Sequence, residues 1–271
     1  MNKLAKKAGK QFFHQLGAGQ LLNELNFRFQ QCRHYFGNRQ FQKKHQRFVF
    51  PTDRALFNTF QLHYQHYYED GLLSAKELIK WSDIKNQERP VILDWGTGTG
   101  RIIRHVPTLL PNAVCYGADL DEALISWCKK NIDAVYFDTI NNKYLPYPSY
   151  YFSAIWGISV FTHIPAKETA DWIAELHRIM KDNAIAVLTT HGSNYFDQLS
   201  LSQQSQLKNQ GMFTIDYKEK GHRLMTTYHE AESFRTMLKN GFQIEAFWEG
   251  KTHLEKMGGQ DCWIIKKVPD A

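Results

Sequence analysis

The fold is decided by the stretch Val91-Ile92-Leu93-Asp94-Trp95-Gly96-Thr97-Gly98-Thr99-Gly100-Arg101. Three apolar residues with high β-propensity end in an acid, and glycines follow at every second position. This pattern is typical of a buried parallel strand that ends in a tight turn before a helix. Each missing Cβ lets backbone N–H groups approach a ligand that a side chain would exclude. The stretch therefore predicts a ligand site at the end of a strand.

A second acid indicates what kind of ligand this is. Asp119 comes nineteen residues after Gly100, directly after the apolar stretch 113–118. An acid at this distance suits a hydrogen bond to the two hydroxyls of a ribose. We therefore interpret the unit as a site for a nucleoside cofactor, and the alternative is a glycine-rich turn that binds nothing.

Charge distinguishes between nucleoside cofactors. A dinucleotide fingerprint reads G-x-G-x-x-G, whereas here the glycines read G-x-G-x-G and Arg101 takes the position of the third glycine. A pyrophosphate also binds best at an electropositive helix N-terminus, and Asp94 beside the turn would repel it. S-adenosylmethionine has no phosphate and carries a sulfonium and an ammonium group. The sequence thus favours S-adenosylmethionine over NAD.

D-x-G-x-G-x-G after a hydrophobic strand resembles motif I of the class I methyltransferases. This resemblance implies S-adenosylmethionine as cofactor. It also gives Asp138, at the end of the third expected strand, the position of an acid that accepts a hydrogen bond from the adenine amino group; an ordinary loop acid is the alternative. The expected cofactor-binding residues are Asp94, Gly96, Thr97, Gly98, Gly100, Arg101, Asp119, Leu120, Asp138 and Ser159.

Further motifs resemble a narrower group, the methyltransferases encoded among bacterial glycan and cell-surface biosynthesis genes. The resemblance covers about residues 48–268 and rests on Val160-Phe161-Thr162-His163-Ile164-Pro165, on residues 172–180, on Thr189-Thr190-His191-Gly192 and on Gly259-Gln260-Asp261. The N-P-P-Y or D-P-P-Y turn of many amide and DNA N-methyltransferases is absent from the sequence, which argues against amino groups of adenine or glutamine as acceptors. The resemblance implies a small polar acceptor, with a saccharide hydroxyl the first choice.

A sugar hydroxyl has a very high pKa, so its methylation gains from a general base, for which histidine is well suited. His163 and His191 follow the fourth and fifth expected strands and are the catalytic candidates, with His229 next. A structural role is the alternative for each. No cluster of carboxylates in the sequence suggests a catalytic metal, and the four scattered cysteines form no C-x-x-C pair that would predict a structural zinc site.

From residue 90 onward, expected strands and helices alternate regularly. Strands are expected at 91–94, 114–118, 134–137, 153–158, 184–190, 242–248 and 261–267, and helices near 100–109, 121–130, 168–180 and 230–239. This alternation predicts an α/β fold with a doubly wound, seven-stranded, mostly parallel sheet. The segment 249–260 is too short for a helical crossover, so the last strand should be antiparallel. That arrangement is Rossmann-like, as in class I methyltransferases.

The remaining sequence divides into a basic N-terminal extension, residues 1–47, and a methyltransferase domain, residues 48–271. Within that domain, 48–89 is a helical lead-in with two helices around Gly71, and 90–271 holds the cofactor-binding sheet and the acceptor pocket. The extension has ten Lys/Arg and one acid, a net charge of +9, whereas the whole chain carries +6, so residues 48–271 carry −3.

The basic extension suggests a partner. Its first expected helix, residues 3–16, carries Leu4, Phe12 and Leu16 on one face, as in peripheral anchors on anionic lipid. We therefore expect this segment to contact the inner face of a membrane; a solvated tail, a helix packed on the catalytic domain and a mitochondrial presequence are the alternatives. The cytoplasmic location itself is expected from the scattered cysteines, two of which the sequence places in core strands as reduced thiols. Two other functions stay open: an RNA methyltransferase that uses the basic segment, although no specific nucleic-acid motif is present, and a non-catalytic S-adenosylmethionine-binding protein.

Overall fold

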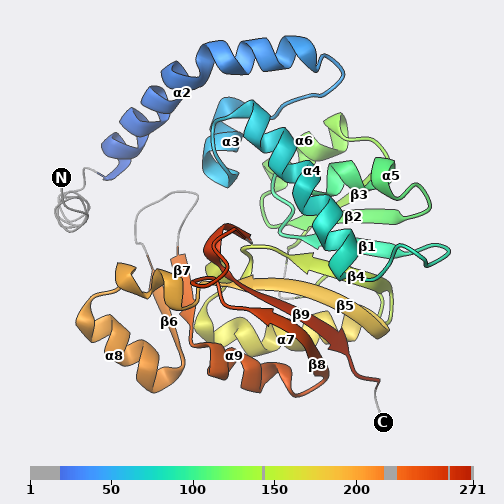
Figure 1. Ribbon diagram of the computed structural model, residues 1–271, viewed down its shortest axis with the longest axis vertical. Helices are drawn as coiled ribbons and strands as arrows, with labels where there is room; N and C mark the ends of the chain where they lie inside the picture. The colour runs from blue at the N-terminus through green and yellow to red at the C-terminus, as the bar shows by residue number, and fades with distance from the viewer. Residues whose placement is uncertain (1–18, 142–143, 217–224, 256, 270–271) are drawn as a thin grey trace. The chain divides into compact units, whose positions relative to one another are not determined.

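The structure, a computed structural model, describes residues 19–141, 144–216, 225–255 and 257–269 (Figure 1). The chain divides into two compact units, residues 1–69 and 70–271. The boundary lies inside helix α4 (Tyr64–Trp81), whereas the sequence suggested one at 47/48. The assignment of residues 48–271 to one domain stays a prediction. The helix expected over residues 3–16 lies outside the described residues.

The second unit is built on a seven-stranded sheet with the order β3-β2-β1-β4-β5-β9-β8. The strands are β1 (Val91–Trp95), β2 (Val114–Asp119), β3 (Val135–Thr139), β4 (Phe152–Gly157), β5 (Met180–Thr190), β8 (Phe242–Trp248) and β9 (Asp261–Lys267). Strands β1 to β5 pair in parallel, and β9 pairs antiparallel with both β5 and β8. The doubly wound, mostly parallel sheet with an antiparallel last strand is confirmed.

Helices cover both faces of this sheet because successive strand side chains point to opposite sides. On β1, Leu93 and Trp95 join a core with helices α7 and α9, whereas Ile92 joins a core with α4, α5 and α6. The bounds of these helices are α5 (Val106–Leu109), α6 (Glu122–Asn131), α7 (Thr169–Ile179) and α9 (Ala231–Leu238). Both faces of the central strands are therefore dry, which explains their continuous apolar sequence.

Two expectations about helices are wrong. Gly71 does not separate two helices but lies inside α4, where a Cβ would come within 2.4 Å of the Arg101 carbonyl oxygen. The glycine permits close packing and does not break the helix. The helix expected near 100–109 is reduced to a 3-10 turn, η1 (Ile103–His105), and the single turn of α5. Pro107 has no N–H to donate and is tolerated only in the first turn of a helix, so a longer helix cannot pass through it.

The sequence did not predict a second, two-stranded sheet made of β6 (Met212–Asp216) and β7 (Met225–His229). These strands lie after β5, between residues 190 and 242, where the sequence predicted no strand. The same region also contains the 3-10 segment η4 (Ser193–Gln198) and α8 (Leu201–Gln210). Most of the residues of β6 are only half-buried, so the strand lacks the apolar run that marks the main sheet. An isolated bridge between His191 and Tyr228 joins this sheet to the end of β5.

The first unit contains α2 (Gly19–Lys44), α3 (Asp53–Thr59) and the beginning of α4. Its core is aromatic and is formed by Phe27, Phe50, Leu56, Leu62 and Tyr67. The expected N-terminal helical extension is thus present as α2. None of the helices in the described ranges has both the length and the apolar character needed to cross a membrane.

Candidate cofactor site

The turn after β1 has the backbone conformation that its glycines allow. Gly96, Gly98 and Gly100 have φ values of 74°, 55° and 68°, a region that L-residues rarely adopt. A Cβ on Gly96 would lie 2.5 Å from Val160 Cγ2, and one on Gly100 would lie 2.5 Å from Ile132 Cδ1. The alternating glycines therefore satisfy both a backbone requirement and a packing requirement. They let the chain pass close to Val160 and Ile132 in the turn that follows β1.

Asp94 lies under this turn and is buried, with 3% of its surface exposed. It accepts a hydrogen bond of 2.8 Å from the Thr97 hydroxyl. Burial raises the pKa of Asp94 to about 7, against the opposing effects of the Thr97 hydrogen bond and the charge of Arg101. A buried carboxylate whose charge is only partly compensated would gain from a cationic ligand and would repel a phosphate. This environment fits S-adenosylmethionine.

Asp119 is held against the same turn by two backbone groups. The Gly98 N–H donates to Asp119 Oδ2 at 2.8 Å, and the Asp121 N–H donates to Oδ1 at 3.0 Å. A carboxylate oxygen accepts more than one hydrogen bond, so both oxygens keep capacity for ribose hydroxyls. The next residue, Leu120, is one of the expected cofactor-binding residues and is 70% exposed. The structure thus brings together the turn and the acid that the sequence paired by spacing alone.

Asp138 lies beside these residues, because β3 pairs with β2 and places Asp138 opposite Ala118. Strand β3 continues to Thr139, one residue beyond Asp138, whereas the sequence placed its end at 137. The Tyr147 hydroxyl donates to Asp138 Oδ2 at 3.0 Å. This tyrosine fixes the orientation of the carboxylate, and no motif in the sequence pointed to it. The role of Asp138 toward adenine stays a prediction.

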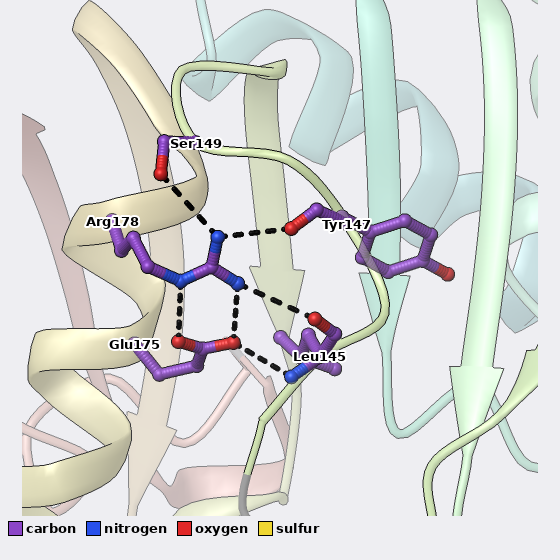
Figure 2. A network of polar contacts seen from close by, with 5 residues as sticks. All are labelled: Leu145, Tyr147, Ser149, Glu175 and Arg178. Atoms are coloured by element: carbon purple, nitrogen blue, oxygen red, sulfur yellow. Dashed lines mark hydrogen bonds and ion pairs between the residues drawn. The ribbon is translucent and has the colours of Figure 1, made fainter.

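The segment that carries Tyr147 is held by an ion pair on α7 (Figure 2). Arg178 donates from Nε to Glu175 Oε2 at 2.8 Å and from Nη2 to Oε1 at 2.7 Å, a bidentate geometry. Glu175 Oε1 also accepts from the Leu145 N–H at 2.6 Å, and Arg178 Nη1 donates to the Tyr147 carbonyl at 2.9 Å. The Glu175 side chain is 2% exposed. This pair therefore fixes residues 145–147 against α7 and positions Tyr147 beside Asp138.

Ser159, two residues after the end of β4, has a left-handed backbone with φ at 62°. Its N–H donates to Thr189 Oγ1 at 2.7 Å, and its hydroxyl accepts from Gln260 Nε2 at 2.7 Å. Thr189 in turn donates to Gln260 Oε1 at 2.5 Å. These contacts join the ends of β4 and β5 to the start of β9 and support the unusual conformation of Ser159. Gln260 was part of a motif used for the resemblance, but its contact with Ser159 was not predicted.

The three candidate histidines converge on β7. His163 ends the 3-10 turn η2 (Phe161–His163), is exposed, and has Nδ1 3.1 Å from the Met225 carbonyl oxygen. His191 is half-buried, stacks on Tyr195 with ring centroids 4.2 Å apart, and accepts at its carbonyl from the His229 N–H. His229 is fully buried, and burial lowers its pKa to about 3.

The three histidines differ in their exposure and in which ring nitrogen carries the proton. His229 has no exposed surface through which to meet an acceptor. A carbonyl oxygen only accepts hydrogen bonds, so His163 must donate from Nδ1 to Met225, and the lone pair of its neutral ring then lies on Nε2. His163 therefore has both the exposure and the tautomer that a general base needs. The catalytic assignment of His163 or His191 stays a prediction.

Comparisons with known proteins bear on the fold and on the reaction. Residues 92–183 match a family described as "Methyltransferase domain", and no curated protein sequence matches the chain. Among solved structures, a SAM-dependent methyltransferase from Methanosarcina mazei is 20% identical, with a TM-score of 0.54 over 69% of this chain and 97% of its own. A putative sarcosine dimethylglycine methyltransferase from Galdieria sulphuraria is 14% identical, with a TM-score of 0.51 over 74% and 86%.

A third solved structure is the complex between the Haloferax volcanii Trm112 methyltransferase activator and a putative methyltransferase. The matching chain is 13% identical, with a TM-score of 0.53 over 74% of this chain and 92% of its own. At such identities these structures show the fold. The matched segment 92–183 contains the glycine turn, Asp119 and Asp138. The domain match and the fold together make S-adenosylmethionine the cofactor and methyl transfer the reaction.

Proposed function

We propose that this S-adenosylmethionine-dependent methyltransferase methylates a hydroxyl group of a saccharide, with His163 as the general base. The cofactor, when bound, supplies a methyl group on a positively charged sulfur. The chain has to hold the acceptor hydroxyl in line with that methyl group, exclude water and remove the hydroxyl proton. A neutral amine acceptor would need no strong base, so a well-oriented base favours a hydroxyl acceptor.

The observation that carries the proposal is the hydrogen bond between His163 Nδ1 and the Met225 carbonyl. It fixes the tautomer and limits ring rotation, as a base requires. As the acceptor oxygen forms its bond to the methyl carbon, its proton passes to Nε2 of His163. S-adenosylmethionine bound at the turn would supply the methyl group and keep the electron pair of the broken carbon–sulfur bond, so that the homocysteine thioether would be the leaving group.

The segment after β5 supports a polyhydroxylated acceptor. Tyr195 and His191 form a half-buried aromatic stack, a flat surface of the kind that the C–H face of a sugar ring contacts. Polar side chains lie between the two rings in the chain: Ser193 donates to Glu249 Oε1 at 2.5 Å, and Asn194 donates to the Gly259 carbonyl at 3.0 Å. Aromatic and polar groups in alternation suit a ligand that has both apolar faces and hydroxyls.

The test measures transfer of a labelled methyl group from S-adenosylmethionine to nucleotide sugars, lipid-linked saccharides and polysaccharides, with tRNA and small amines as comparison acceptors. With an accepted saccharide, His163→Ala should lower kcat about 10²–10⁴-fold with cofactor affinity nearly unchanged. His66→Ala is the matched control, since that side chain is also exposed but lies on α4 in the first unit. His191→Ala tests the other candidate.

The possible results distinguish between the candidate bases and between the candidate functions. Normal turnover in His163→Ala would refute His163 as the base, and normal turnover in both variants would mean that positioning alone suffices. Methylation of tRNA but of no saccharide would replace the proposal with a nucleic-acid methyltransferase. Cofactor binding without transfer to any acceptor tested would favour a binding protein.

A further inference from the structure

Helix α2 presents an apolar stripe to solvent. The stripe consists of Leu22, Leu25, Phe29, Cys32 and Phe36, spaced alternately by three and four residues, and so lies along one line of the helix. All five are exposed, Phe29 to 61% and Phe36 to 82% of their surface. Isolated apolar residues on a surface are ordinary, but a continuous row of them marks an interaction site.

The stripe is not the face by which α2 packs in its own unit. That face contains Phe27, which is 5% exposed, and Asn38, which accepts from the Tyr64 N–H at 2.9 Å. At about 100° per residue, the two faces lie on opposite sides of the helix. The core of the first unit therefore does not require the apolar residues of the stripe.

Positive charge flanks the stripe on both sides. The helical repeat places Arg28 and Arg39 along one side and Arg33 and Lys44 along the other, and Lys43 continues the line of the stripe. The one acid of the helix, Glu24, lies away from the stripe and pairs with Arg28 and Arg54. The exposed surface of α2 thus combines an apolar row with cations and has no acid beside it.

A second feature lies at the carboxyl end of the helix. Lys43, Lys44 and Arg47 line a hollow of about 550 Å³ together with His45, Gln46, Phe48 and Tyr68. The hollow has three cationic side chains and no acidic one. Its composition suits the phosphate of an anionic headgroup, which accepts charge-assisted hydrogen bonds.

We propose that the apolar stripe of α2 binds the surface of an anionic lipid bilayer. The apolar side chains enter the boundary between headgroups and acyl chains while the flanking Lys and Arg residues contact lipid phosphates. A second copy of the chain is a poorer partner, because pairing two such helices would bring cations against cations. The proposal places membrane contact on residues 19–47 and does not depend on the identity of the methyl acceptor.

The test is co-sedimentation of the full chain with vesicles of phosphatidylcholine alone or with about one third phosphatidylglycerol. The full chain should sediment with the anionic vesicles at low salt, remain in solution with the neutral ones, and be released as ionic strength rises. Phe29→Ser with Phe36→Ser should weaken binding at least tenfold. Arg33→Gln with Lys43→Gln should weaken binding to the anionic vesicles about 25-fold, because each lost charge reduces the affinity about fivefold.

Matched changes elsewhere in the chain serve as controls. Leu201→Ser removes an apolar side chain that is 85% exposed on α8, and Lys129→Gln with Lys130→Gln removes two exposed charges on α6. Both variants should bind vesicles as the unaltered chain does. All the substituted side chains are exposed, so thermal unfolding should show that each variant is folded.

Cys32 provides an independent measurement, because it is exposed on the stripe whereas Cys115, Cys128 and Cys262 are buried. A polarity-sensitive fluorophore on Cys32 should shift to shorter wavelength when anionic vesicles are added. The same label on Gln42→Cys in a Cys32→Ser background lies about 80° from Cys32 on the helix and should respond much less.

The proposal is overturned if the full chain does not bind anionic vesicles, if it binds neutral vesicles equally well, or if the stripe variants bind like the unaltered chain. Salt-resistant self-association lost in Phe29→Ser with Phe36→Ser, without vesicle binding, would instead assign the stripe to a contact between copies. Cofactor binding measured in the same variants keeps this result separate from the test of the acceptor.

Discussion

Replacing Asp94 by asparagine should stabilise the cofactor-free protein in a pH-dependent way. The carboxyl group ionises near pH 3.8 when the chain is unfolded, whereas burial raises its pKa to about 7 in the folded state. Between these values the folded state holds more protons than the unfolded state, so the free energy of unfolding of the unaltered protein falls as pH rises. The amide introduced by Asp94→Asn does not ionise and brings no such dependence, while its oxygen keeps an acceptor for the Thr97 hydroxyl.

The magnitude follows from the pKa. Between pH 5 and pH 7 the destabilisation of the folded state by the Asp94 carboxyl group grows by about 1.4 kcal/mol for each pH unit, and above the folded pKa it stays constant. The free energy of unfolding of Asp94→Asn relative to the unaltered protein should therefore be higher at pH 8.5 than at pH 5, by about 3 kcal/mol. Any pH-independent cost of packing the amide cancels in this comparison.

Urea unfolding at the two pH values, without cofactor, measures the difference. Asp133→Asn is the control, since it makes the same change of charge at an exposed position and should show little change between the two pH values. The same Asp94→Asn protein should bind S-adenosylmethionine at least tenfold more weakly by calorimetry, because the carboxylate interacts with a cationic ligand. An equal stability difference at both pH values would refute the argument that burial suppresses the ionisation of Asp94.

Two further substitutions test other parts of the site. Asp119→Ala should weaken S-adenosylmethionine binding by about 1.5–3 kcal/mol in calorimetry, with no measurable binding of NAD by either protein; unchanged affinity or tight NAD binding would contradict the ribose assignment. Glu175→Ala should lower the free energy of unfolding by about 1–3 kcal/mol, because it leaves the Leu145 N–H and Arg178 without their partner. Glu232→Ala breaks an exposed pair with Arg235 at the same spacing and should cost less than about 1 kcal/mol; equal losses in urea unfolding would show that burial of Glu175 is unimportant.

The strands of the main sheet were predictable because each is a local apolar run. Six of the seven expected strand ranges agree with the structure to within about two residues, and β5 begins four residues earlier than expected. Helices were less predictable where tertiary contacts override a local rule. Gly71 lies inside α4, and the position requires glycine because the Arg101 carbonyl oxygen lies where a Cβ would be; no property of residues near 71 in the sequence reports that contact.

What the sequence determined by itself is the cofactor end of the site. A strand, a turn of alternating glycines and an acid at fixed spacing specify a backbone geometry, since only glycine accepts left-handed angles without strain. What the tertiary structure decided is which distant groups meet there. Tyr147 reaches Asp138 through an ion pair on α7, Gln260 supports Ser159 from 101 residues away, and Met225 orients His163 from 62 residues away. Local residue preferences act over a few positions, whereas these contacts depend on how the strands and their connections pack, which no short stretch of the chain specifies.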